Sequence, residues 1–162
     1  MNLVSTQSNN ILLADDDSDD CMIFEEALKE VNAQTQLTIE SDGHLLMERL
    51  RNLVQPLPDI LFLDLNMPKK NGAECLCEIR SLPRLKNIPI IILSTSCQRQ
   101  TVNKMYEQGA NYYICKPSDF GQLKDALQNV LSFTIDVLTK KPTRENFLLS
   151  YAQFFSLLRQ HH

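Results

Sequence analysis

The 162-residue sequence predicts an α/β fold with a doubly wound, five-stranded parallel sheet. Apolar runs separated by amphipathic segments carry this prediction, because parallel strands covered on both faces are apolar almost throughout. Four such runs occur: ILLA (11–14), ILFL (60–63), IPIIIL (88–93) and YYI (112–114). Alternating strands and helices favour right-handed crossovers between neighbouring parallel strands.

The first half of the chain supplies two strands and two helices. After the strand at 11–14, apolar residues keep helical spacing over 18–32, with Asp17 or Ser18 as the N-cap. The run QLTIE (36–40) alternates polar and apolar residues, which is typical of a strand at a sheet edge. Leucines at helical spacing then predict a helix over 42–54.

The second half repeats the alternation three times. The strand at 60–63 is followed by a predicted helix over 71–81. The strand at 88–93 precedes a helix over 97–108, which Gly109 closes. The strand at 112–114 leads into a helix over 118–131.

A C-terminal extension, 132–162, follows this α/β domain, which we place at 9–131. The extension is too short for a second domain of the usual size. Its apolar residues form one helical stripe, which predicts a helix over 143–159 with Thr143 as its cap. The stripe consists of Phe147, Leu148, Tyr151, Phe154, Phe155 and Leu158.

Composition narrows the class of protein. Apolar residues make up 43% of the chain and charged residues 22%, which indicates a globular protein, and the net charge of −4 argues against a nucleic-acid or membrane partner. The polar N-terminus lacks a signal-peptide pattern, so we expect a cytoplasmic protein. Five cysteines without a CxxC pair then predict reduced thiols.

Polar side chains follow four of the predicted strands. DDDSDD (15–20) follows the first strand, Asp64 the third, Ser94 the fourth and Lys116 the fifth. In the flavodoxin-like strand order 2-1-3-4-5 these four ends meet in one crevice, where such sheets bind ligands. Clustered carboxylates need a cation, and Mg²⁺ prefers oxygen ligands. With the lysine and the hydroxyl, the set predicts a site for a phosphoryl group.

Each feature also has a structural interpretation. DDDSDD alone suits a solvated loop and helix cap, Ser94 a strand-terminal hydroxyl, and Lys116 an exposed turn. Asp64 is more informative, because a charge at the end of a buried strand is costly without partners. The combination, in this order, favours a functional site.

These residues resemble the receiver domains of two-component response regulators over residues 9–131. The matching stretches are ILLADDDSDD, LFLDLNMPKKNG, IIILSTS and YYICKPSDF. The resemblance implies that Asp64 is the phosphoacceptor. It implies that Asp15 and Asp16 bind Mg²⁺ with Asp64 and the backbone carbonyl of Asn66.

The resemblance also assigns the switch residues. Ser94 takes the place of the switch serine or threonine, Lys116 that of the invariant lysine, and Tyr113 that of the switch aromatic residue. The peptide bond before Pro117 is expected to be cis, as in the family.

The implied protein is a signalling phosphoacceptor rather than an enzyme. A sensor histidine kinase or a histidine phosphotransfer protein is the expected donor, and we expect output through protein–protein contacts and a homodimer, without direct DNA or membrane binding. A haloacid-dehalogenase-type phosphatase is the rival hypothesis, but its D-x-D motif needs Thr or Val where this chain has Asp19. A receiver-like adaptor that is never phosphorylated is the third.

Overall fold

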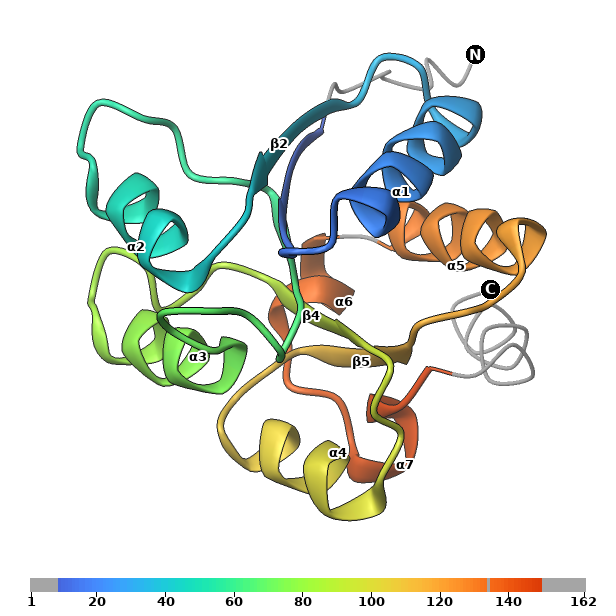
Figure 1. Cartoon of the computed structure of the whole chain (residues 1–162). Coiled ribbons are helices and arrows are strands. Elements are labelled where there is room, and N and C mark those ends of the chain that lie inside the picture. Colours follow the sequence, from blue (N-terminus) through green and yellow to red (C-terminus); the bar gives the residue numbers. More distant parts are fainter. Residues whose placement is uncertain (1–8, 134, 150–162) are drawn as a thin grey trace, which may run out of the picture.

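The computed structural model describes residues 9–133 and 135–149 (Figure 1). Its five strands form one parallel sheet in the order β2-β1-β3-β4-β5, as the sequence predicts. The strands are β1 (Asn10–Ala14), β2 (Gln36–Glu40), β3 (Ile60–Leu63), β4 (Ile90–Ser94) and β5 (Tyr112–Cys115). The intervening helices are α1 (Ser18–Val31), α2 (Gly43–Arg51), α3 (Gly72–Ser81), α4 (Arg99–Glu107) and α5 (Phe120–Ser132).

Helices cover both faces of the sheet, which explains why the central strands are apolar throughout. Successive strand residues point to opposite faces, so Ile11 and Leu13 pack beneath α1 and α5. Leu12 and Leu61 pack on the other face, against α2 and α3. β2 is only half-buried, in agreement with its predicted place at the sheet edge.

The predicted helices are present, with shifted ends. α2 ends at Arg51 rather than 54, because Asn52 adopts an extended conformation. α4 begins at Arg99 rather than 97, after Gln98, whose side chain makes no capping hydrogen bond. None of the helices of the described chain has the length and apolar content that spanning a bilayer requires.

The C-terminal extension packs against β5 and α4. Its first helix, α6 (Ile135–Thr139), is held where Asn111 donates a side-chain hydrogen bond to the carbonyl oxygen of Leu138 at 2.6 Å. Its second helix, α7 (Arg144–Phe147), buries Phe147 against Tyr106 and Tyr113, with ring centroids 5.2 and 6.2 Å apart.

The predicted helix over 143–159 is wrong at 148 and 149. α7 ends at Phe147, and Leu148 forms a β-bridge with Tyr113 of the edge strand β5. The backbone amide of Leu149 then donates to the carbonyl oxygen of Tyr113 at 2.9 Å. An open sheet edge offers unpaired backbone groups, and pairing with them competes with helix formation here. Positions 150–159 lie outside the described residues.

The cysteine prediction is also wrong in one respect. Cys97 and Cys115 form a disulfide, with their Cα atoms 5.7 Å apart, whereas Cys21, Cys75 and Cys77 are free. The two residues meet because the loop between β4 and α4 runs beside the end of β5, a proximity that the sequence spacing does not reveal.

We predict that Phe147→Ala weakens docking of the extension by about 3 kcal/mol, the scale of a buried aromatic side chain. Amide hydrogen exchange at Leu149 should accelerate, since its hydrogen bond to Tyr113 depends on this docking. Phe120→Ala is the control, because Phe120 is partly exposed on α5. Unchanged exchange at Leu149 would contradict the prediction.

Candidate functional site

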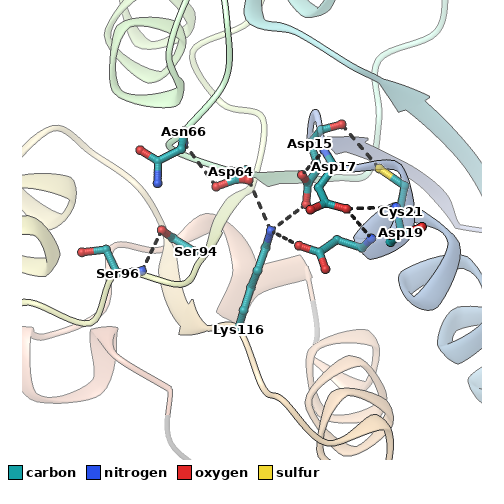
Figure 2. A network of polar contacts seen from close by, with 10 residues as sticks. Asp15, Asp17, Asp19, Cys21, Asp64, Asn66, Ser94, Ser96 and Lys116 are labelled. Atoms are coloured by element: carbon teal, nitrogen blue, oxygen red, sulfur yellow. Dashed lines mark hydrogen bonds and ion pairs between the residues drawn. The ribbon is translucent and has the colours of Figure 1, made fainter.

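The carboxyl edge of the sheet brings the predicted residues together (Figure 2). Asp15 follows β1, Asp64 follows β3, Ser94 ends β4 and Lys116 follows β5. These strands are neighbours in the parallel sheet, so their last residues lie side by side. Asp15, Asp64 and Ser94 are buried, and the Lys116 side chain is only 13% exposed.

Lys116 is the centre of the site. Its ammonium nitrogen lies 2.8 Å from Asp15 Oδ2, 2.9 Å from Asp20 Oδ2 and 3.2 Å from Asp64 Oδ2. Burial by itself disfavours the charged amine. Hydrogen bonds with Asp15 and Asp20 and the charge of Asp64 outweigh that effect, so the pKa of Lys116 is raised. The lysine is therefore a firmly charged group beside the Asp64 carboxylate.

Asp64 is buried at the start of the loop after β3. Burial, and the nearby charge of Asp15, raise the pKa of Asp64 from 3.8 to about 6, although Lys116 and the backbone amide of Asn66 favour the ionised form. That amide donates to Asp64 Oδ1 at 3.3 Å. The position of the Asn66 carbonyl relative to a metal stays a prediction. At neutral pH Asp64 is a carboxylate whose charge is costly to bury.

Three carboxylates form a group that suits a divalent cation. Asp15, Asp16 and Asp64 each offer an oxygen, and these oxygens all lie within 4.8 Å of one another. Asp16 is exposed, which gives solvent access to one side of the group. An all-oxygen set open to water fits Mg²⁺, which retains several waters when bound to proteins.

The acidic residues of the run 15–20 have different roles. Asp17 is the N-cap of α1, and its Oδ1 accepts hydrogen bonds from the backbone amides of Asp19 and Asp20 at 2.9 and 3.0 Å. Asp19 is exposed in the first turn of α1. Sequence reasoning missed the contact of Asp20 with Lys116. The signal was its place in the first helical turn, where side chains point back toward the helix N-terminus.

A chain of contacts connects this site to the extension. The buried Ser94 Oγ accepts a hydrogen bond from the backbone amide of Ser96 at 3.2 Å. The Tyr113 hydroxyl donates to the carbonyl oxygen of Ser96, and the Tyr113 ring contacts Phe147. The switch pair predicted from the sequence is therefore joined through one loop, that between β4 and α4.

The expected cis bond before Pro117 is wrong for this structure, since no cis peptide bond occurs among the described residues. The trans form of an X–Pro bond is intrinsically favoured by roughly 0.5–1 kcal/mol. Next to this trans bond, the Lys116 backbone amide donates a hydrogen bond to the carbonyl oxygen of Ser94 at 2.8 Å.

Comparisons with known proteins identify the relatives of this chain. The family model of the response regulator receiver domain matches residues 11–128. Response regulator Rcp1 of Synechocystis is 35% identical over 133 residues, which cover 80% of this chain and 90% of Rcp1. The probable methanogenesis regulatory protein FilR2 of Methanothrix harundinacea is 29% identical, over 76% of this chain and 81% of FilR2.

Solved structures agree with the fold. The phosphorylated cyanobacterial phytochrome response regulator RcpA is 34% identical with a TM-score of 0.72, covering 78% of this chain and 93% of RcpA. The Mn²⁺-bound form of Rcp1 is 34% identical with a TM-score of 0.71, covering 83% of this chain and 99% of Rcp1.

We predict that Asp64→Asn, without divalent cations, raises the free energy of unfolding at pH 7.5 by about 1–2 kcal/mol. The folded-state pKa of Asp64, about 6, exceeds its ordinary value of 3.8, so the wild type loses stability as pH rises between these values. The variant's advantage should therefore be absent below about pH 4 and complete above about pH 6 to 7.

Urea unfolding in EDTA across this pH range measures the difference. Asp19→Asn is the matched control, because Asp19 carries the same charge but is exposed and lies outside the group of Asp15, Asp16 and Asp64. An advantage of Asp64→Asn that stays constant from pH 4 to pH 8 would contradict the prediction.

Proposed function

Because the chain belongs to the response regulator receiver family, we propose that it accepts a phosphoryl group on Asp64 from a phosphohistidine of a partner protein. The observation that carries this proposal is the Lys116 ammonium, 3.2 Å from the Asp64 carboxylate and beside a group of oxygen ligands. The family acts in two-component signalling, and the site has the parts that phosphoryl transfer requires.

In the proposed reaction an oxygen of Asp64 attacks the phosphorus atom, and the bond from phosphorus to the histidine nitrogen breaks. The electron pair of that bond stays on the leaving imidazole, and an acyl phosphate forms on Asp64. Lys116 donates hydrogen bonds to the transferring oxygens as their charge builds. Mg²⁺ held by Asp15, Asp16, Asp64 and the Asn66 carbonyl would supply further charge neutralisation.

A protein donor needs a surface around this site. A hollow beside Lys116 is lined by Asp20, Ile23 and Phe120, among other residues of the β1–α1 and β5–α5 regions. Ile23 and Phe120 are 44% and 38% exposed, and neighbouring Met22 is 59% exposed. Exposed apolar side chains beside charged groups are typical of protein-binding sites, which supports a histidine kinase or phosphotransfer protein as donor.

The proposed output runs through Ser94 and Tyr113. A phosphoryl group on Asp64 offers new acceptor oxygens to Ser94, which at rest accepts a hydrogen bond from the Ser96 amide. Moving Ser94 disturbs the loop that Tyr113 contacts through Ser96, and thereby the packing of Phe147. Homodimer formation stays a prediction, with α4, β5 and α5 as its expected surface and the extension adding contact area.

The phosphatase hypothesis finds no support in the site. Its D-x-D motif would need Asp17 as a catalytic carboxyl group, but that carboxylate caps α1. We therefore retain the phosphoacceptor as the proposed function.

We predict that acetyl phosphate with Mg²⁺ labels Asp64 alone. Asp64→Asn should lose the label, because an amide is a poor nucleophile. Borohydride reduction of the acyl phosphate followed by mass spectrometry locates the modified residue. Asp59→Asn is the control, since Asp59 is exposed at the opposite end of β3. Labelling of Asp64→Asn at the wild-type level would refute the proposal.

We also predict that Asp16→Asn weakens Mg²⁺ binding by more than about tenfold, because a ligand and its charge are both lost. Asp19→Asn removes the same charge nearby from an exposed residue outside the group and should change binding far less. Calorimetric titration compares the two variants. Equal losses of Mg²⁺ affinity in the two variants would contradict the prediction, because the acidic run would then attract the ion only through its overall charge.

A further inference from the structure

We propose that Asp20 is a positioning residue for phosphoryl transfer, which keeps the Lys116 ammonium beside Asp64 when a cation occupies the site. This inference rests on the proposed function. In the sequence Asp20 is an ordinary member of the acidic run, but its contact with Lys116 distinguishes it from its neighbours.

Three carboxylates surround the Lys116 ammonium group. An ammonium group has three N–H donors and no acceptor. Three carboxylate oxygens lie within hydrogen-bond distance of Lys116 Nζ, from Asp15 at 2.8 Å, Asp20 at 2.9 Å and Asp64 at 3.2 Å. The lysine is thus held by one carboxylate from α1 and two from the strand ends.

Asp20 differs from the other two partners of Lys116. Asp15 and Asp64 belong to the oxygen group that suits a divalent cation, whereas Asp20 does not. A bound cation would draw on the carboxylates of Asp15 and Asp64 and would weaken their hold on another positive charge. Asp20 would then remain as the partner of Lys116 that does not bind the cation.

The start of α1 fixes Asp20 in this place. Its backbone amide donates to the N-cap side chain of Asp17 at 3.0 Å, which anchors the first helical turn. From there the side chain points back toward the helix N-terminus and the end of β1. Asp19, one residue earlier, forms no ion pair with Lys116 and is exposed, although it shares the same turn and charge.

The long lysine stem makes such an anchor useful. A lysine side chain is flexible, and it must place its charge where the transferring oxygens develop theirs. The Asp20 side chain is 42% exposed, so its hydrogen bond to Lys116 contributes less free energy than one between buried charged groups. Losing the negative charge of this acceptor should slow phosphorylation by about tenfold.

A double-mutant cycle tests this role. Single-turnover phosphorylation by acetyl phosphate is measured at saturating Mg²⁺ for the wild type, Asp20→Asn, Asp19→Asn, Lys116→Met and the double variant Asp20→Asn/Lys116→Met. Asp20→Asn should be slower than wild type by about tenfold, and Asp19→Asn by less than about twofold. With methionine at 116, Asp20→Asn should add less than about twofold.

Additional measurements separate positioning from other effects. Mg²⁺ affinity of Asp20→Asn should match that of Asp19→Asn, and urea unfolding should show that both variants fold. Asp20→Ala, which removes the hydrogen-bonding oxygen as well as the charge, should give the same coupling to Lys116.

Distinct results would overturn the inference and the proposed function. If Asp20→Asn reacts like Asp19→Asn, or slows the reaction equally with and without Lys116, Asp20 does not position the lysine, while Asp64 labelling still supports the phosphoacceptor. If the wild type is not labelled on Asp64, the proposed function fails and the inference fails with it.

Discussion

The ion pairs between Lys116 and the carboxylates of Asp15, Asp20 and Asp64 are the interaction on which the rest of the structure depends. Two of these carboxylates are buried, and buried charges require partners. The partner follows β5, which β3 and β4 separate from β1, so the charges are balanced only when these four strands are assembled. Fold and site therefore impose the same constraint: four strand ends must meet.

The same lysine links the site to the far edge of the sheet. Its backbone amide pairs with Ser94, and the loop after Ser94 contacts Tyr113 through Ser96. Tyr113 in turn pairs with Leu148 and packs on Phe147 of the extension. These packed and hydrogen-bonded contacts form a continuous path from Lys116 to the extension.

Sequence reasoning predicted the sheet because strands that are buried on both faces are apolar at every position, as in the run ILFL. It predicted Asp64, Ser94 and Lys116 as one site because parallel strands end at one edge. It could not predict the meeting of Cys97 with Cys115, which depends on the path of a loop. The family resemblance led to the wrong prediction of a cis bond before Pro117. The predicted helix in the extension was wrong at Leu148, because this residue pairs with the open edge of the sheet instead of continuing the helix.

The acidic run shows why equal residues in a sequence are unequal in a fold. Asp15 forms an ion pair with Lys116, and Asp17 caps α1. Asp16 is exposed to water and belongs to the group of three carboxylates that suits a divalent cation. Asp19 and Asp20 share the first turn, where negative charge favours the helix dipole, but only Asp20 reaches the lysine. One helical residue, about 100° of rotation, separates a solvated carboxylate from one bound to the central charge of the site. Net charge alone cannot express that difference, because it resides in the direction of each side chain.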